Sequence, residues 1–189
     1  VNIRAALLAY YQQYKRDLPW RRTRDAYKIW VSEIMLQQTQ VDTVIERYKQ
    51  FLQRYPNVQA LARVSEEEVC EAWAGLGYYR RARYLQQAAR IVVENWQGEL
   101  PRQVNILRKL PGIGAYTAGA IASIAFNQCE PLVDGNVARV LARLMALEHS
   151  VERGTGKKII WDCAAKLVQG PDPGDFNQSL MELGALICR

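Results

Sequence analysis

Two carboxylates in the sequence stand in contrasting surroundings. Glu33 lies within Trp30-Val-Ser-Glu-Ile-Met-Leu36, an otherwise apolar stretch in which burial would disfavour ionisation and raise the pKa of the carboxyl. Asp134, in Val133-Asp-Gly-Asn-Val137, precedes an amphipathic stretch and is well placed as an ionised helix N-cap. One neutral and one ionised carboxyl are what acid-assisted cleavage of a glycosidic-type bond requires. The simpler alternatives are a Glu33 that is solvated or paired with an arginine, and an Asp134 that only caps a helix.

A glycine-rich turn has the form of a phosphate-binding site. In Leu110-Pro-Gly-Ile-Gly-Ala-Tyr-Thr-Ala-Gly-Ala120, Gly112 and Gly114 permit a tight turn with positive φ and leave no Cβ between backbone N–H groups and an anion. A helix is predicted to follow at once, so its free N-terminal N–H groups point the same way. The pattern suits a nucleic-acid phosphate, and the alternative is a simple helix-entry turn.

The composition is that of a globular protein with a basic surplus. The chain has 189 residues, 49% of them hydrophobic and 23% charged, and its net charge of +6 favours polyanionic partners. No apolar run approaches the length of a membrane span, and no secretory leader is expected at Val1. The four cysteines form no Cys-x-x-Cys pair, which is typical of a reduced intracellular protein.

Helical periodicity dominates, so an all-α fold with short connections is predicted. The first helix is expected to join the last ones in any division into subdomains, and Ser65 with Glu68 predicts a capping box. The predicted helices share an amphipathic or small-residue pattern and span 3–15, 27–37, 41–55, 66–74, 79–96, 116–126, 136–147, 157–168 and 176–188.

Several long motifs in order resemble a known family. The segments 110–120 and 133–137 together resemble the helix-hairpin-helix DNA glycosylase superfamily. Four further motifs resemble those of the MutY-type adenine DNA glycosylases within this superfamily. They are Leu18-Pro-Trp-Arg21, Trp30-Val-Ser-Glu-Ile-Met-Leu-Gln-Gln-Thr-Gln40, Gly75-Leu-Gly-Tyr-Tyr79 and Phe176-Asn-Gln…Glu-Leu-Gly-Ala185. The resemblance implies one catalytic domain over residues 1–189, with the hairpin at about 103–126. It also implies an all-α fold of two helical subdomains, with the DNA and the base pocket between them.

By this resemblance the protein is a monofunctional base excision repair glycosylase. It would flip adenine mispaired with 8-oxoguanine or guanine out of duplex DNA and hydrolyse its N-glycosidic bond. Glu33 would protonate adenine N7, and Asp134 would stabilise the oxocarbenium-like intermediate. Tyr116 would sit against the sugar and the Asp, while Asn136 would help to order the site. Strand-cleaving relatives carry a Lys nucleophile at the position of Tyr116, and a phenol cannot form a Schiff base.

The resemblance also assigns residues to the DNA. Trp20, Arg21 and Gln178 resemble positions that line the adenine pocket. Gly112 and Gly114 would grip phosphate, Gln38 would fill the space left in the duplex, Thr39 would contact the opposite base, and Tyr78 would wedge between bases, with Leu36 and Leu76 nearby. For Gln38 and Tyr78 the alternatives are a surface amide and a packed aromatic. The basic candidates for backbone contacts are Arg21, Arg22, Arg24, Arg80, Arg81, Arg83, Lys157 and Lys158.

The sequence departs from this family near its last residue. MutY-type enzymes bind a 4Fe–4S cluster through four cysteines, and Cys188 matches only the first of them. The family cofactor therefore cannot be completed from this chain. Either the sequence is truncated, which we favour, or the protein lacks the cluster. Cys70, Cys129 and Cys163 do not match ligand positions, and we expect them in the core. By the same resemblance, we expect residues 1–189 not to include the family's C-terminal 8-oxoguanine recognition domain, which predicts weaker discrimination against guanine.

Two rival functions remain open. A glycosylase of the same fold that removes thymine or uracil opposite guanine would suit Tyr116 and Asp134, but protonation by Glu33 at N7 is chemistry that only a purine can use. A noncatalytic helix-hairpin-helix DNA-binding module would need neither carboxylate beyond folding. We expect a monomer that acts on double-stranded DNA and not on membranes. Its expected location is the bacterial cytoplasm or, in a eukaryote, the nucleus or mitochondrion.

Overall fold

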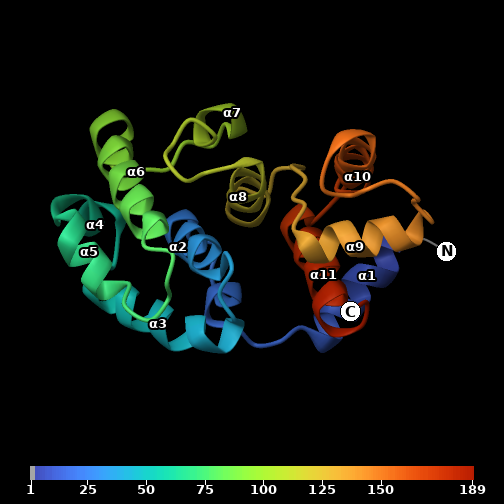
Figure 1. Cartoon of the computed structure of the whole chain (residues 1–189), viewed down its shortest axis with the longest axis horizontal. Helices are drawn as coiled ribbons and strands as arrows, with labels where there is room; N and C mark the ends of the chain where they lie inside the picture. Colours follow the sequence, from blue (N-terminus) through green and yellow to red (C-terminus); the bar gives the residue numbers. More distant parts are fainter. Residues whose placement is uncertain (1–2) are drawn as a thin grey trace. The chain divides into compact units, whose positions relative to one another are not determined.

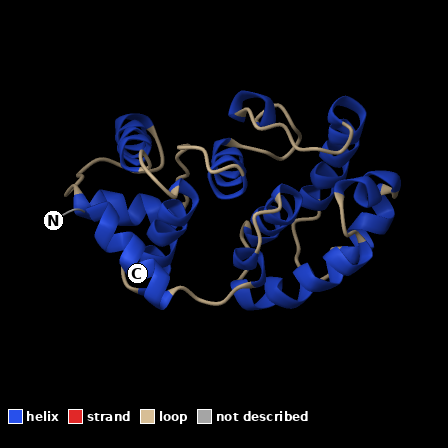
Figure 2. Ribbon diagram, turned by 180° about the vertical axis from the view of Figure 1, so that it is seen from behind, coloured by secondary structure: helices blue, strands red, loops and turns tan. Residues whose placement is uncertain are grey.

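In the computed structural model, which describes residues 3–189, all the regular elements are helices (Figures 1 and 2). The all-α prediction is therefore confirmed over that range. The chain contacts divide into two compact units, one of residues 17–121 and the other of the N-terminal helix together with residues 122–189. Within the described range no helix is both long and apolar enough to span a membrane.

The unit of residues 17–121 is built around one central helix. Helix α2 (Ala26–Leu36) packs against α3, α6, α8 and a 3-10 helix at Pro19–Arg22. Nearly all of α2 is buried, from Tyr27 to Met35 apart from Lys28, as its apolar sequence predicts. The remaining helices of this unit are α3 (Val41–Arg54), α4 (Val58–Arg63), α5 (Glu66–Ala72), α6 (Arg80–Trp96), α7 (Val104–Leu107) and α8 (Ala115–Ala120).

Side-chain caps fix where several of these helices begin. The Ser65 hydroxyl accepts the backbone N–H of Glu68 at 3.2 Å, and the Glu68 carboxylate accepts that of Ser65 at 2.9 Å, so the predicted capping box is confirmed. Asn57 caps α4 in the same way, accepting the N–H of Ala60 at 2.9 Å. Helix α4, the 3-10 helix and α7 were not predicted, because six residues or fewer carry too little periodicity to recognise.

The second unit joins the first helix of the chain to the last. It contains α1 (Ile3–Tyr14), α9 (Gly135–Leu144), α10 (Gly154–Leu167) and α11 (Pro173–Leu186), and α11 packs against both α1 and α9. In Figure 1 the blue α1 lies beside the red α11. Arg16, just after α1, places Nε 3.0 Å and Nη2 2.7 Å from the buried carboxylate of Glu182 in α11. This ion pair secures the expected association of the first helix with the last ones.

The helix predicted over 116–126 differs from the observed one. Helix α8 continues into a π-helical turn at Ile121–Ala125, where each hydrogen bond spans one residue more than in an α-helix. The boundary between the two units falls after Ile121, within this turn. Asn177 of α11 donates to the Ser123 hydroxyl at 2.8 Å and to the Glu130 carbonyl at 2.9 Å. These bonds hold the widened turn against α11.

Candidate functional site

Helix α2 holds the Glu33 carboxyl in a buried position, with 4% of the residue exposed. The alternative of a solvated Glu33 is therefore wrong. The Tyr116 hydroxyl, on α8, donates a hydrogen bond to Glu33 Oε2 at 2.6 Å. A second bond between the same helices joins Gln37 Nε2 to Thr117 Oγ1 at 3.3 Å. The phenol thus fixes the orientation of a buried carboxyl, a short contact typical of a hydroxyl and a carboxyl group.

Asp134 is the N-cap of α9, as its sequence context predicts. Its Oδ1 accepts the backbone N–H of Val137 at 2.7 Å, and its Oδ2 accepts Asn136 Nδ2 at 2.9 Å. Both carboxylate oxygens therefore have donors from the first turn of the same helix. The side chain is held in one orientation at a half-buried position, which suits a group that must meet a ligand.

A hydrogen-bonded chain extends from Asp134 into α11 through Arg139, a residue the sequence analysis missed. Arg139 Nη2 donates to Asn136 Oδ1 and to the Gly184 carbonyl, each at 2.8 Å, and its Nε donates to the Cys188 carbonyl at 2.6 Å. The signal available was spacing, because Arg139 follows Asn136 by three residues and so shares its helix face. Gly184 permits the close approach, since a Cβ there would lie 2.6 Å from the Asn136 Cβ.

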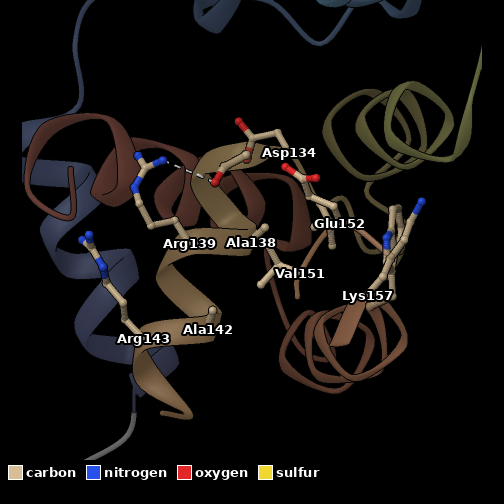
Figure 3. Close-up of a pocket in the computed structure, with 11 residues that line it drawn as sticks. Asp134, Ala138, Arg139, Ala142, Arg143, Val151, Glu152 and Lys157 are labelled. Atoms are coloured by element: carbon tan, nitrogen blue, oxygen red, sulfur yellow. Dashed lines mark hydrogen bonds between the residues drawn. The ribbon is translucent and has the colours of Figure 1, made fainter. Parts of the chain in front are cut away.

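Asp134 also lines an open groove of about 680 Å³ along α9. Figure 3 shows Glu152 and Lys157 on one side of α9, and Arg139 and Arg143 on the other. The dashed line in that view marks the bond from Arg139 to the Gly135 carbonyl, at 3.5 Å. Among the charged side chains that line the groove, the three cations outnumber the two carboxylates, Asp134 and Glu152, which gives the groove a small positive surplus.

Two neighbouring segments of the other unit present the residues expected to enter DNA. The Thr39 hydroxyl donates to the Leu76 carbonyl at 3.3 Å, so the segments 36–39 and 76–78 are in contact. Gln38 is exposed with φ 56°, and Tyr78 is 60% exposed with φ 47°. The packed-aromatic alternative for Tyr78 is therefore wrong. Leu36 is half-buried and Leu76 is 4% exposed, so Leu76 presents almost none of its surface to solvent.

The expected base-pocket residues fall in different units. Trp20 and Arg21 lie in the 3-10 helix that packs on α2, whereas Gln178 lies in α11 with Nε2 3.4 Å from Asp175 Oδ1. Trp20 is 7% exposed, and its ring meets that of Tyr48 edge-on at 5.5 Å. Burial raises the pKa of Tyr48 well above its ordinary value, so the phenol beside Trp20 stays neutral.

The glycine turn is a hairpin between α7 and α8. Gly112 has φ +76°, which favours glycine, and a Cβ there would come within a tight 3.0 Å of Tyr84 Cβ. Gly114 is different, because it is the N-cap of α8 with φ −87°. A Cβ on Gly114 would meet no atom within 4 Å, which leaves its side of the helix start open to an approaching group.

The cysteines do not form a metal centre in the described part of the chain. Cys188 is half-buried, and its Sγ lies 3.2 Å from Arg143 Nη1. No three His, Cys, Asp or Glu residues lie together as ligands among residues 3–189, and a single cysteine does not fit a 4Fe–4S cluster, which needs four. The prediction that the other three cysteines lie in the core is wrong. Cys70 in α5 and Cys163 in α10 are partly exposed, and Cys129, in the loop before α9, is exposed.

One of the basic residues predicted to contact DNA phosphates is buried. Arg81 is 9% exposed and donates to main-chain carbonyls, so it is not available to the DNA backbone. Arg21 is half-buried, whereas exposed positions are found for Arg22, Arg24, Arg80, Arg83, Lys157 and Lys158. The charge pattern alone could not separate Arg81 from its neighbours.

Comparison with known proteins decides the family. The model of the HhH-GPD superfamily of base excision DNA repair proteins matches residues 31–163. The chain belongs to this superfamily. The match includes Glu33, the glycine hairpin and Asp134, so the superfamily resemblance carried by segments 110–120 and 133–137 is confirmed.

Individual relatives agree with this membership. The HhH-GPD chain is 53% identical to the human adenine DNA glycosylase over 98% of its own length and 36% of the human protein. It spans about a third to a half of the length of the curated relatives that it matches. A thermostable thymine-DNA glycosylase structure is 32% identical with a TM-score of 0.89, covering 98% of this chain and 86% of the other. A trapped endonuclease III–DNA covalent intermediate, 21% identical, matches with a TM-score of 0.81 over 98% of this chain and 84% of the other. The helix-hairpin-helix glycosylase fold is thus confirmed.

Proposed function

We propose that the chain is the catalytic part of a DNA glycosylase that removes adenine mispaired with 8-oxoguanine or guanine. The observation that carries the proposal is the buried Glu33 carboxyl, oriented by the Tyr116 hydroxyl at 2.6 Å. A pyrimidine has no N7 to protonate, whereas a purine leaves far more readily once N7 carries a proton. The 50–53% identity to human and plant adenine DNA glycosylases supports the same substrate.

The chemistry divides between the two carboxyls. Glu33 donates a proton to N7 of the extruded adenine, which weakens the N-glycosidic bond. Asp134, fixed by Val137 N–H and Asn136, stabilises the positive charge that develops on the deoxyribose. Water then completes the hydrolysis. Trp20, Arg21 and Gln178 line the base pocket in this proposal.

The proposed enzyme is monofunctional and works as a monomer on duplex DNA. Strand cleavage by β-elimination needs an amine that can form a Schiff base with the abasic sugar, and the hairpin carries Tyr116 instead. Borohydride trapping tests this directly. A covalent protein–DNA complex formed in high yield would refute monofunctional chemistry.

A second candidate is a thymine–guanine mismatch glycosylase, because the thermostable thymine-DNA glycosylase shares the fold at a TM-score of 0.89. Single-turnover excision separates the two, using duplexes with adenine opposite 8-oxoguanine, adenine opposite guanine, and thymine opposite guanine. Release of free adenine with an intact abasic strand supports the proposal. Thymine release would move the assignment to the second candidate, and binding without product would favour a DNA-binding module.

A further inference from the structure

Arg81 occupies an unusual position for a charged side chain. It lies in the first turn of α6, is 9% exposed, and directs its guanidinium into the protein. Its Nη1 donates to the carbonyls of Ile34 and Met35, each at 2.9 Å, and to that of Gln37. These three acceptors are the last main-chain groups of α2 and its C-cap, which have no partners within the helix.

The second nitrogen of the same guanidinium bonds to a different segment. Arg81 Nη2 donates to the Leu76 carbonyl at 2.9 Å, the Gly77 carbonyl at 3.2 Å and the Thr39 hydroxyl at 3.0 Å. One planar group therefore joins the end of α2 to the turn before α6. A lysine could not do this, because its ammonium is a point donor without a fork.

Both joined segments contain an exposed residue in the left-handed region. Gln38 has φ 56° and Tyr78 has φ 47°, conformations that residues other than glycine rarely adopt without support from their surroundings. Gln38 follows Gln37 and Tyr78 follows Gly77, and Arg81 donates to the carbonyls of both Gln37 and Gly77. The Arg81 guanidinium also lies 5.5 Å from the Tyr78 ring centroid, so it contacts the exposed aromatic directly.

We propose that Arg81 is a positioning residue that locks the segments 36–39 and 76–78 into one arrangement before DNA binds. Gln38 and Tyr78 are thereby presented together for insertion into the duplex. This inference rests on the proposed function for its DNA role. An aromatic that is already ordered loses little entropy on stacking between bases, so pre-ordering favours insertion.

The test uses the 189-residue chain and the variants Arg81→Met and Arg81→Lys. The matched control is Arg90→Met, because Arg90 lies on the same helix and also donates to main-chain carbonyls, those of Ala62 and Val64 at 3.2 and 3.1 Å, away from both segments. Amide hydrogen exchange is measured on peptides covering 36–40 and 75–79. We expect both Arg81 variants to exchange about tenfold faster in both segments together, with no change in the control.

The DNA readout is base unstacking, measured without excision. The probe duplex carries non-cleavable 2′-fluorodeoxyadenosine opposite 8-oxoguanine, beside a 2-aminopurine whose fluorescence rises when its neighbour leaves the stack. If the ordered arrangement falls to one-tenth of the population, the apparent affinity for this duplex falls about tenfold. Affinity for an undamaged duplex, which depends on phosphate contacts, stays unchanged.

The outcomes separate this inference from the proposed function. If the wild-type chain raises the probe fluorescence, and folded Arg81→Met or Arg81→Lys raises it equally with the same affinity, the Arg81 inference alone is overturned. Equal loss of affinity for damaged and undamaged duplexes overturns it as well. Wild-type segments that exchange like an unstructured peptide overturn it even if neither variant folds. A wild-type chain with protected segments that neither brightens the probe nor releases adenine refutes the proposed function, and the DNA role of Arg81 with it.

Discussion

Replacing Gly184 by alanine tests whether the contact between α9 and α11 positions Asp134. The added Cβ would lie 2.6 Å from Asn136 Cβ and 2.9 Å from the Asn136 carbonyl oxygen. Carbon atoms pack at about 3.5–4.0 Å, so one helix must move by roughly 1 Å. The obstructing atoms are backbone and Cβ, which no side-chain rotation can clear.

The cost follows from two opposing effects. Overpacking of a core costs about 1–3 kcal/mol, and a backbone obstruction belongs at the upper end of that range. The higher helix propensity of alanine stabilises the folded state by about 1 kcal/mol relative to glycine. The net destabilisation is therefore about 2 kcal/mol, which lowers Tm by roughly 4–8 °C for a protein of this size. A displacement of about 1 Å at a catalytic group lowers the rate about a hundredfold.

Thermal unfolding and single-turnover adenine release measure both effects. Gly135→Ala is the control for stability, because a Cβ on Gly135 would meet nothing within 4 Å and its φ is not in the left-handed region. Its Tm should equal that of the wild type or exceed it slightly. A Gly184→Ala protein with wild-type Tm and rate would show that α9 is not held by this contact.

Three further predictions follow from the same contacts. Glu33→Gln and Asp134→Asn should each abolish adenine release while leaving DNA affinity largely intact, and a retained single-turnover rate in either variant would refute that residue's role. Tyr116→Phe removes the bond to the Glu33 carboxyl and should slow release about tenfold or more at a cost of about 1–3 kcal/mol in stability, and an unchanged rate would exclude the positioning role. Arg16→Met leaves the buried Glu182 carboxylate without its bidentate partner and should cost about 2–4 kcal/mol in urea unfolding, a value that a change below 1 kcal/mol would contradict.

Local sequence patterns predicted the parts of the site that depend on neighbouring residues. The apolar stretch around Glu33 indicated burial, and the Asp134 context indicated an N-cap, since both depend on residues within one or two turns. The long amphipathic helices were found for the same reason. In contrast, the bond between Tyr116 and Glu33 joins residues 83 positions apart, and no local signal encodes it.

Charged residues show the clearest limit of sequence reasoning. Arg81 stands among Arg80 and Arg83 in a basic run, and a basic run predicts a solvated surface. The burial of Arg81 depends on unpaired carbonyls at the end of α2, about 45 residues earlier in the chain. Arg139 is similar, because its partners on α11 appear only after α9 and α11 are packed. Both arginines satisfy backbone groups that the fold would otherwise leave without donors.

The discontinuous unit has a consequence for synthesis. Residues 17–121 are continuous in the chain and can pack as soon as they leave the ribosome. Helix α1 instead needs α11, and the ion pair that secures it joins residues 166 positions apart. At 5–20 residues per second, the apolar face of α1 with Leu7 and Tyr11 waits roughly 10–30 s for its partner. Helix α1 is therefore made well before the helix against which it packs.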